Sequence, residues 1–124
     1  AKIIKAAGNM ITGPFDEVIR SLMVAVYELG VTEIMVVGHE DCGMQHSTSE
    51  SLKERMLARG IKPEAIAAVE GEFAKWVDAF HHPRENVAKT VEAIRNNQLL
   101  PDDVTVHGLI FCPESGKLEV VVHG

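Results

Sequence analysis

The sequence predicts an α/β fold: a mostly parallel β-sheet flanked by helices, with an antiparallel strand at its C-terminal edge. Three observations support this prediction. Residues 33–37 form a short apolar run with the length of a buried strand. Residues 15–29, just before it, carry apolar side chains at helical spacing. Near the C-terminus, two further apolar runs flank Pro113-Glu114-Ser115-Gly116, a turn sequence typical of a hairpin.

The first half of the chain predicts a βαβ unit. Residues 1–6 are expected to form a strand, followed by the turn Ala7-Gly8-Asn9. Thr12-Gly13-Pro14 predicts the start of helix 15–29, and Gly30 predicts its end. Together with strand 33–37, these elements imply parallel pairing with a right-handed crossover.

The second half predicts three more helices and the terminal hairpin. The helices are expected at 51–59, from Pro63 to about residue 80, and at 84–97, with His81-His82-Pro83 interrupting the last two. Strands are expected at 104–111 and 117–123, the second antiparallel and at the sheet edge. We expect residues 1–124 to form a single domain. Because a domain seldom begins inside a strand, we also expect it to have an N-terminal part upstream of Ala1.

Composition narrows the class of protein. The 124 residues suit one domain, and 46% of them are hydrophobic, enough for a core. The formal net charge of -6 argues against nucleic acid or an anionic membrane as a partner. Two cysteines do not make a disulfide scaffold, and no apolar run has membrane length, so we expect a cytoplasmic protein.

A possible metal site follows the strand 33–37. Gly38 is followed by His39, and Cys42 comes three residues later, where an imidazole and a thiolate could reach one Zn²⁺ ion. The alternative is a tight turn with a core cysteine and a surface histidine. Two turns, 7–9 and 39–43, are expected at the carboxyl ends of strands, where open α/β sheets bind ligands, and this favours the metal site.

Other potential ligands are weaker. Cys112 is better explained as a small buried hydrophobe than as a third ligand. We expect Asp41 to orient the loop, and His107 to pack or hydrogen-bond within a strand. Surface positions suit the remaining histidines near these motifs, which are His46, His81 and His82.

At this point the sequence resembles the β-class carbonic anhydrases. The turn Ala7-Gly8-Asn9, the helix before the strand 33–37, the motif His39-Glu-Asp-Cys42-Gly43 and the C-terminal segments 99–118 carry the resemblance, in order and at family-like spacing. The likeness covers nearly the whole chain and looks closest to the plant- and archaeal-type branch.

The resemblance implies a zinc ion held by one histidine and two cysteines, and His39 and Cys42 match two of these ligands. The family's other cysteine belongs to a Cys-x-Asp-x-Arg motif that precedes the first strand expected here. Neither that motif nor its Asp and Arg, the family's catalytic pair, is present in these residues.

The implied function is zinc-dependent, reversible hydration of carbon dioxide to bicarbonate, in a homodimer or a higher homo-oligomer. One alternative is hydrolysis of carbon disulfide or carbonyl sulfide on the same fold. Another is a truncated, non-catalytic member that binds zinc weakly and serves as an interaction protein.

Overall fold

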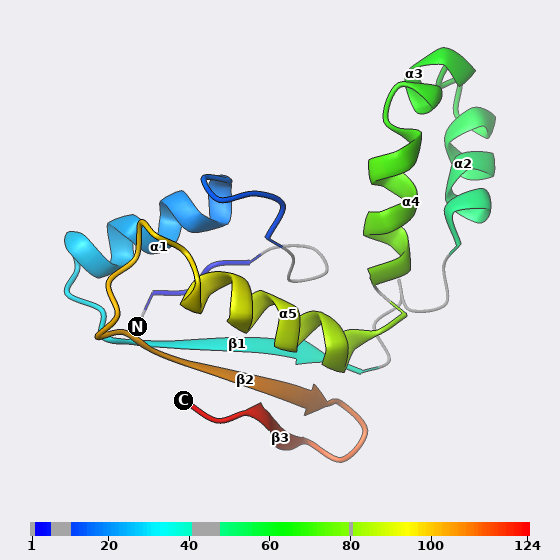
Figure 1. Cartoon of the computed structure of the whole chain (residues 1–124). Helices are drawn as coiled ribbons and strands as arrows, with labels where there is room; N and C mark the ends of the chain where they lie inside the picture. Colours follow the sequence, from blue (N-terminus) through cyan, green and yellow to red (C-terminus); the bar gives the residue numbers. More distant parts are fainter. Residues whose placement is uncertain (1, 6–10, 41–47, 80) are drawn as a thin grey trace. The chain divides into compact units, whose positions relative to one another are not determined.

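The computed structural model describes residues 2–5, 11–40, 48–79 and 81–124 (Figure 1). It divides into two compact units. One comprises Ala1–Glu40 together with Pro83–Gly124, and the other Asp41–His82. We describe each unit by itself. That the chain forms one domain stays a prediction.

The first unit contains a three-stranded sheet in the order β1-β2-β3. Strands β1 (Glu33–His39) and β2 (Thr105–Cys112) pair in parallel, with Glu33 opposite Thr105 and His39 opposite Phe111. Strand β3 (Lys117–Val122) pairs antiparallel to β2 and forms an edge. The predicted α/β class, the parallel pair and the antiparallel edge strand are therefore confirmed.

The strand predicted at residues 1–6 is wrong for the described residues 2–5, which have no regular secondary structure. Ile3 is 75% exposed, and only Ile4 of this segment packs against the core. A strand needs a neighbouring strand whose backbone groups pair with its own N–H and C=O groups. Among the described residues, β1 pairs with β2 and not with residues 2–5. The predicted turn 7–9 lies outside the described residues.

Helix α1 (Glu17–Tyr27) is shorter than the predicted 15–29. Its N-cap is Asp16, whose carboxylate accepts from the backbone N–H of Ile19 at 2.8 Å and from that of Thr12 at 2.8 Å. The start predicted from Thr12-Gly13-Pro14 is therefore too early, because Asp16 caps the helix. Gly30, with φ of 69°, turns the chain after the helix as predicted.

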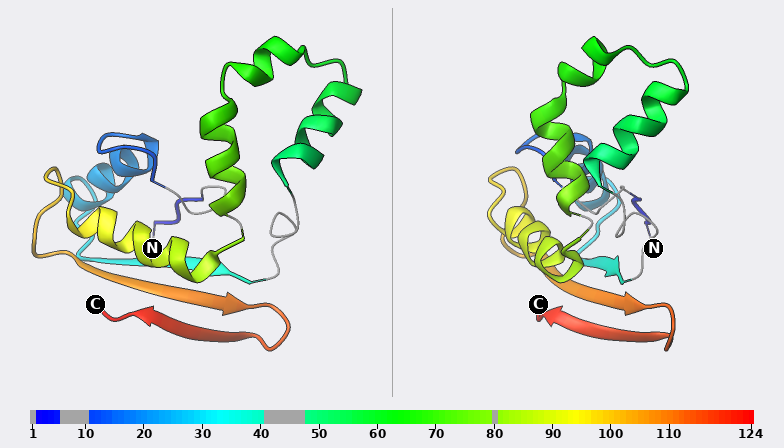
Figure 2. Two further views of the ribbon diagram at one scale, coloured as in Figure 1. Left: turned by 45° about the vertical axis from the view of Figure 1, so that its right-hand side comes forward. Right: turned by 90° about the vertical axis from the view of Figure 1, so that its right-hand side faces the viewer.

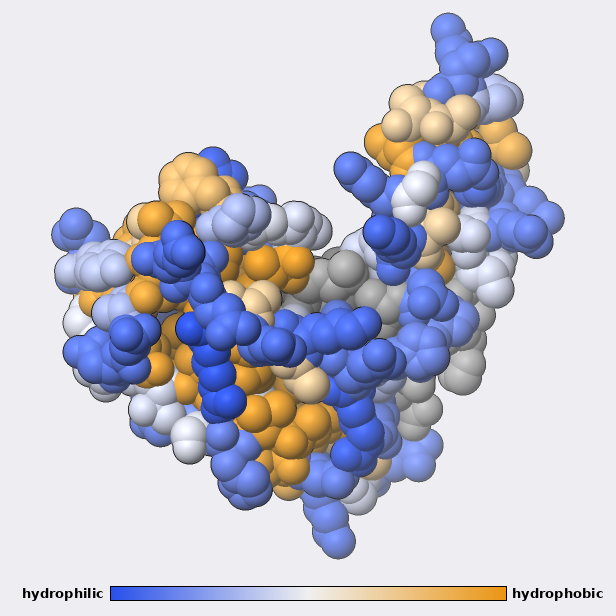
Figure 3. Space-filling model, viewed as in Figure 1, coloured by the Kyte–Doolittle hydropathy of each residue, from blue (hydrophilic) through white to orange (hydrophobic). Residues whose placement is uncertain are grey.

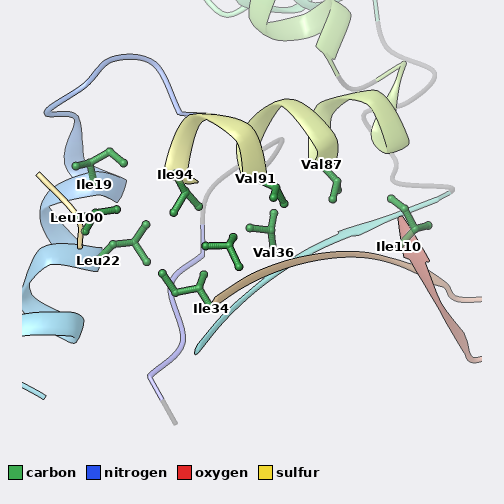
Figure 4. Close-up of a cluster of buried hydrophobic side chains, with 10 residues drawn as sticks. Ile19, Leu22, Ile34, Val36, Val87, Val91, Ile94, Leu100 and Ile110 are labelled. Atoms are coloured by element: carbon green, nitrogen blue, oxygen red, sulfur yellow. The ribbon is translucent and has the colours of Figure 1, made fainter. Parts of the chain in front are cut away.

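Helix α5 (Pro83–Arg95) packs against β1 and β2 and completes the core of this unit. Figure 2 shows α1 and α5 on the same side of the three strands. In Figure 4, side chains of α5 and α1 point toward those of the sheet. The buried cluster consists of Ile19, Leu22, Ile34, Val36, Val87, Val91, Ile94, Leu100, Val106 and Ile110.

Two glycines allow α5 to lie close to the sheet. A Cβ on Gly38 of β1 would come within 2.7 Å of Val87 Cγ2, and one on Gly108 of β2 within 2.8 Å of Val87 Cγ1. Val87 is fully buried, and a β-branched side chain has little freedom to move aside. The absence of a side chain at both positions therefore sets the distance between helix and sheet.

The second unit is helical, with α2 (Ser49–Ala58), α3 (Pro63–Ala67) and α4 (Glu70–Ala79). A capping box between Thr48 and Ser51 begins α2. Lys53 of α2 bonds to Glu70 of α4. One helix from Pro63 to about residue 80 had been expected, and this is wrong, because a turn at residues 68–69 separates α3 from α4.

No helix in the described ranges is long and apolar enough to cross a membrane. On the face shown in Figure 3, apolar side chains are visible between charged ones over the sheet unit.

Candidate metal site at the end of strand β1

His39 is the last residue of β1, and its position follows from the alternation of the strand. Ile34 and Val36 point to the helix-covered face and are buried, whereas Met35, Val37 and His39 lie on the opposite face and are exposed. The imidazole therefore stands at the carboxyl end of a parallel strand, at the edge of the sheet where ligands bind in open α/β folds.

The ring of His39 makes no hydrogen bond or ion pair with any other described residue. Among those residues both of its nitrogens are thus available to an external ligand. Cys42, Asp41 and His46 lie outside the described residues. The convergence of His39 and Cys42 on one metal-sized point accordingly stays a prediction.

Other cysteine and histidine candidates lie elsewhere. Cys112 is half-buried and ends β2 one residue beyond Phe111, the partner of His39, so alternation turns its side chain to the helix-covered face, away from His39. His107 lies 2.7 Å, Nε2 to Oε1, from Glu33, which confirms that it hydrogen-bonds within the sheet. His81 and His82 lie at the break before α5, as expected.

Among residues 2–5, 11–40, 48–79 and 81–124, no three or more His, Cys, Asp or Glu side chains lie together in a way that could hold a metal ion. His39 contributes a neutral nitrogen donor of the type zinc prefers, and the sequence places a sulfur donor three residues on. The donor chemistry of the two predicted ligands therefore fits zinc.

Arg84, Glu119 and Glu40, the residue that follows His39, form a charged cluster. Arg84, in the first turn of α5, donates two hydrogen bonds to the Glu119 carboxylate of β3, at 2.9 and 2.5 Å. Its Nη2 also lies 3.2 Å from Oε1 of Glu40. The backbone N–H of Glu40 donates to the carbonyl of Phe111 at 3.0 Å. Glu40 is thus held through both its main chain and its side chain.

The pKa values of Arg84 and Glu119 are shifted in this cluster. The hydrogen bond from Arg84, with the attraction of its charge, holds the pKa of Glu119 below the ordinary glutamate value. The same hydrogen bond raises the pKa of Arg84, and the nearby Glu40 adds a smaller effect in the same direction. Arg84 and Glu119 therefore stay charged at neutral pH.

Sequence reasoning had assigned no role to this cluster. One signal was present: a cation in the first turn of a helix opposes the helix dipole, so Arg84 needs compensating carboxylates nearby. The sequence does not show which carboxylates compensate Arg84, because Glu40 follows β1 whereas Glu119 lies in β3, and the sheet brings them together.

The family model described as "Carbonic anhydrase" matches residues 1–118 of the chain. The Bacillus subtilis protein named "Putative carbonic anhydrase YtiB" is 42% identical over 126 residues, covering 99% of this chain and 67% of the relative. The chain belongs to the β-class carbonic anhydrase family. A carbon disulfide hydrolase of Acidithiobacillus thiooxidans is 32% identical, over 95% of this chain and 62% of that protein.

Among solved structures, β-carbonic anhydrase isoform I of Trichomonas vaginalis matches with a TM-score of 0.90 and 43% identity, over 98% of this chain and 67% of that one. The carbonic anhydrase resemblance inferred from the sequence is therefore confirmed at the level of the family. The chain spans about two thirds of the length of these relatives, with 62% as the lowest of the three values.

Proposed function

We propose that this carbonic anhydrase family member catalyses the reversible hydration of carbon dioxide to bicarbonate, with zinc as its metal. The observation that carries the proposal is His39: a partner-free imidazole, among the described residues, at the carboxyl end of β1. It opens the motif that matches the family's zinc ligands, and the match to the family runs through residues 1–118.

His39 and Cys42 would hold the metal, through a ring nitrogen and a thiolate. Zinc, when bound, lowers the pKa of water to about 7 and so makes a hydroxide nucleophile available at neutral pH. The reaction consumes one water and one carbon dioxide and releases bicarbonate and a proton to buffer. On the same face of the sheet as His39, Val37 and Phe111 supply partly exposed apolar surface, which suits a small apolar substrate.

Carbon disulfide hydrolysis is the second candidate, because relatives with 28–32% identity carry the name carbon disulfide hydrolase. Apolar surroundings suit both substrates. Carbon dioxide is favoured since the relatives named carbonic anhydrase include one with 42% identity. The non-catalytic alternative predicts a protein without zinc-dependent turnover of either substrate.

We also propose that the protein is a homodimer or a higher homo-oligomer. Apolar side chains of two segments face solvent in the isolated chain. Val24, Tyr27 and Leu29, in and after α1, are between 53% and 59% exposed, and Leu118 and Val120 of β3 are 59% and 46% exposed. Exposed apolar side chains in these two segments support association with another chain.

The test measures carbon dioxide hydration by stopped flow, and carbon disulfide hydrolysis in parallel, on the protein as its gene encodes it. We expect rapid carbon dioxide hydration that is lost on zinc removal, restored by added zinc, and lost in His39→Ala. A matched control is His123→Ala, which removes an exposed imidazole directly after β3, beside the first part of β2, and should leave the rate unchanged. Hydration that survives in His39→Ala, or turnover of carbon disulfide alone, would contradict the proposal.

A further inference from the structure

Arg84 occupies an electrostatically unfavourable place that the structure compensates. It lies directly after Pro83 in the first turn of α5, where the exposed N–H groups of the helix favour anions over cations. Glu119 and Glu40, from two different segments of the sheet unit, provide the compensating charge. Arg84 therefore joins α5, β3 and the end of β1 in one cluster.

The geometry of the cluster is specific. Arg84 Nη1 donates to Oε1 of Glu119 and Nη2 donates to Oε2, the paired arrangement that a rigid guanidinium allows and a lysine cannot form. Exposed ion pairs usually add little to global stability, and the side chain of Arg84 is 48% exposed. A bidentate pair can nevertheless hold the guanidinium in one place, and from there it reaches Glu40.

The residues on both sides of His39 are held by α5. Before it, Gly38 lies under Val87, with the space for its Cβ already taken. After it, Glu40 is bound by Arg84 through its side chain and by Phe111 through its backbone. The side chain of His39 has no partner among the described residues, so its orientation depends on its backbone, which the pairing with β2 and these two neighbours hold.

We propose that Arg84 is a positioning residue for His39: by holding Glu40 it fixes the end of β1 and presents the imidazole in one orientation to the metal. The proposal rests on the proposed function, since it concerns the metal ligand named there. Groups that orient a metal ligand without touching the metal commonly change metal affinity about 10- to 100-fold when they are removed. For an arginine acting through a neighbouring residue, we expect the lower end, about tenfold.

Two readouts test the proposal, on the protein as its gene encodes it. The first is amide hydrogen exchange in metal-free protein, followed at Glu40, whose N–H bonds to the Phe111 carbonyl. The second is zinc affinity, from competition with a chromogenic chelator. Arg84→Ala should speed exchange at Glu40, leave exchange at Ile34 and Val106 unchanged, and weaken zinc binding about tenfold.

The controls separate positioning from general loss of a charge. Lys89→Ala removes a different ion pair of the same helix, with Glu85, and should change neither readout. Arg84→Lys keeps the charge without the bidentate geometry and should restore zinc affinity only in part. Glu40→Gln should reproduce the effect of Arg84→Ala, and combining the two should add little, because both break the same contact.

Unchanged zinc affinity and unchanged Glu40 exchange in Arg84→Ala would overturn the proposal while leaving the proposed function intact. Exchange that rises equally throughout β1 and β2 would also overturn it, since Arg84 would then act only on overall stability. The zinc affinity of the wild type is measured first and could show that it binds no zinc. That result would remove the proposed function, and with it the role of Arg84 toward a metal ligand.

Discussion

At the scale of single residues, the lowered pKa of Glu119 makes the stability of the fold depend on pH. Its carboxylate accepts two hydrogen bonds from Arg84, and these lower its pKa from the ordinary value. A group whose pKa is lower in the folded than in the unfolded state stabilises the fold above its unfolded pKa. That contribution is lost as the pH falls through the lowered, folded pKa.

We therefore expect Glu119 to titrate below the ordinary glutamate value of about 4.3 in carboxyl-carbon NMR spectra. Arg84→Ala should bring its pKa back to that value. Glu70 of α4, whose pKa is lowered by the hydrogen bond from Lys53, serves as the control, and its pKa should stay lowered in Arg84→Ala. A Glu119 pKa that does not rise in Arg84→Ala would show that the bidentate pair does not persist in solution.

At the scale of secondary structure, the contact between α5 and the sheet depends on residues without a side chain. An alanine at Gly38 would place its Cβ 2.7 Å from Val87 Cγ2 and 3.2 Å from Ile110 Cδ1, and both neighbours are buried. Gly38→Ala should destabilise the protein by about 1–3 kcal/mol through overpacking, measured from urea unfolding curves.

Gly71, inside α4, is the matched control for this substitution. A Cβ there meets nothing within 4 Å. Gly71→Ala should therefore stabilise the protein, by about 0.4–1 kcal/mol, because alanine has less backbone freedom to lose on folding. If Gly38→Ala leaves the unfolding midpoint unchanged, the close packing of α5 on β1 is not present in solution.

The elements with a local signal were predicted from the sequence. The strand 33–37 and the Pro113–Gly116 turn have clear apolar runs and turn residues, and both correspond to observed elements, β1 and the β2–β3 connection. The strand predicted over residues 2–5 is wrong because its formation depends on a pairing partner elsewhere in the chain. Its two adjacent isoleucines have strand propensity, but a strand also requires a paired neighbour, which no local pattern reveals.

The candidate site was predictable only in part. His39 could be assigned to a strand end because glycine and histidine directly follow the apolar run, and the structure has it as the last residue of β1. Arg84 and Glu119 are 35 positions apart, so their pairing depends on tertiary packing. The contact between Arg84 and Glu40 could not be inferred for the same reason.

For the molecule as a whole, the proposed self-association can be tested at β3. We expect sedimentation velocity at micromolar concentration to show a dimer or a larger species. Leu118→Lys, on an exposed apolar position of β3, should shift the distribution toward the monomer. Leu57→Lys, at a 45% exposed leucine of α2, is the control and should not. A monomeric wild type would refute the proposal.

The central claim is that the motif beginning at His39 binds zinc. The most direct measurement is the zinc content per chain, by elemental analysis after exhaustive dialysis, of the wild type, Cys42→Ser and Cys112→Ser. We predict one zinc per chain in the wild type and in Cys112→Ser, whose cysteine lies on the face of β2 turned away from His39. Cys42→Ser should lose the metal, whereas stoichiometric zinc in that variant would contradict the account.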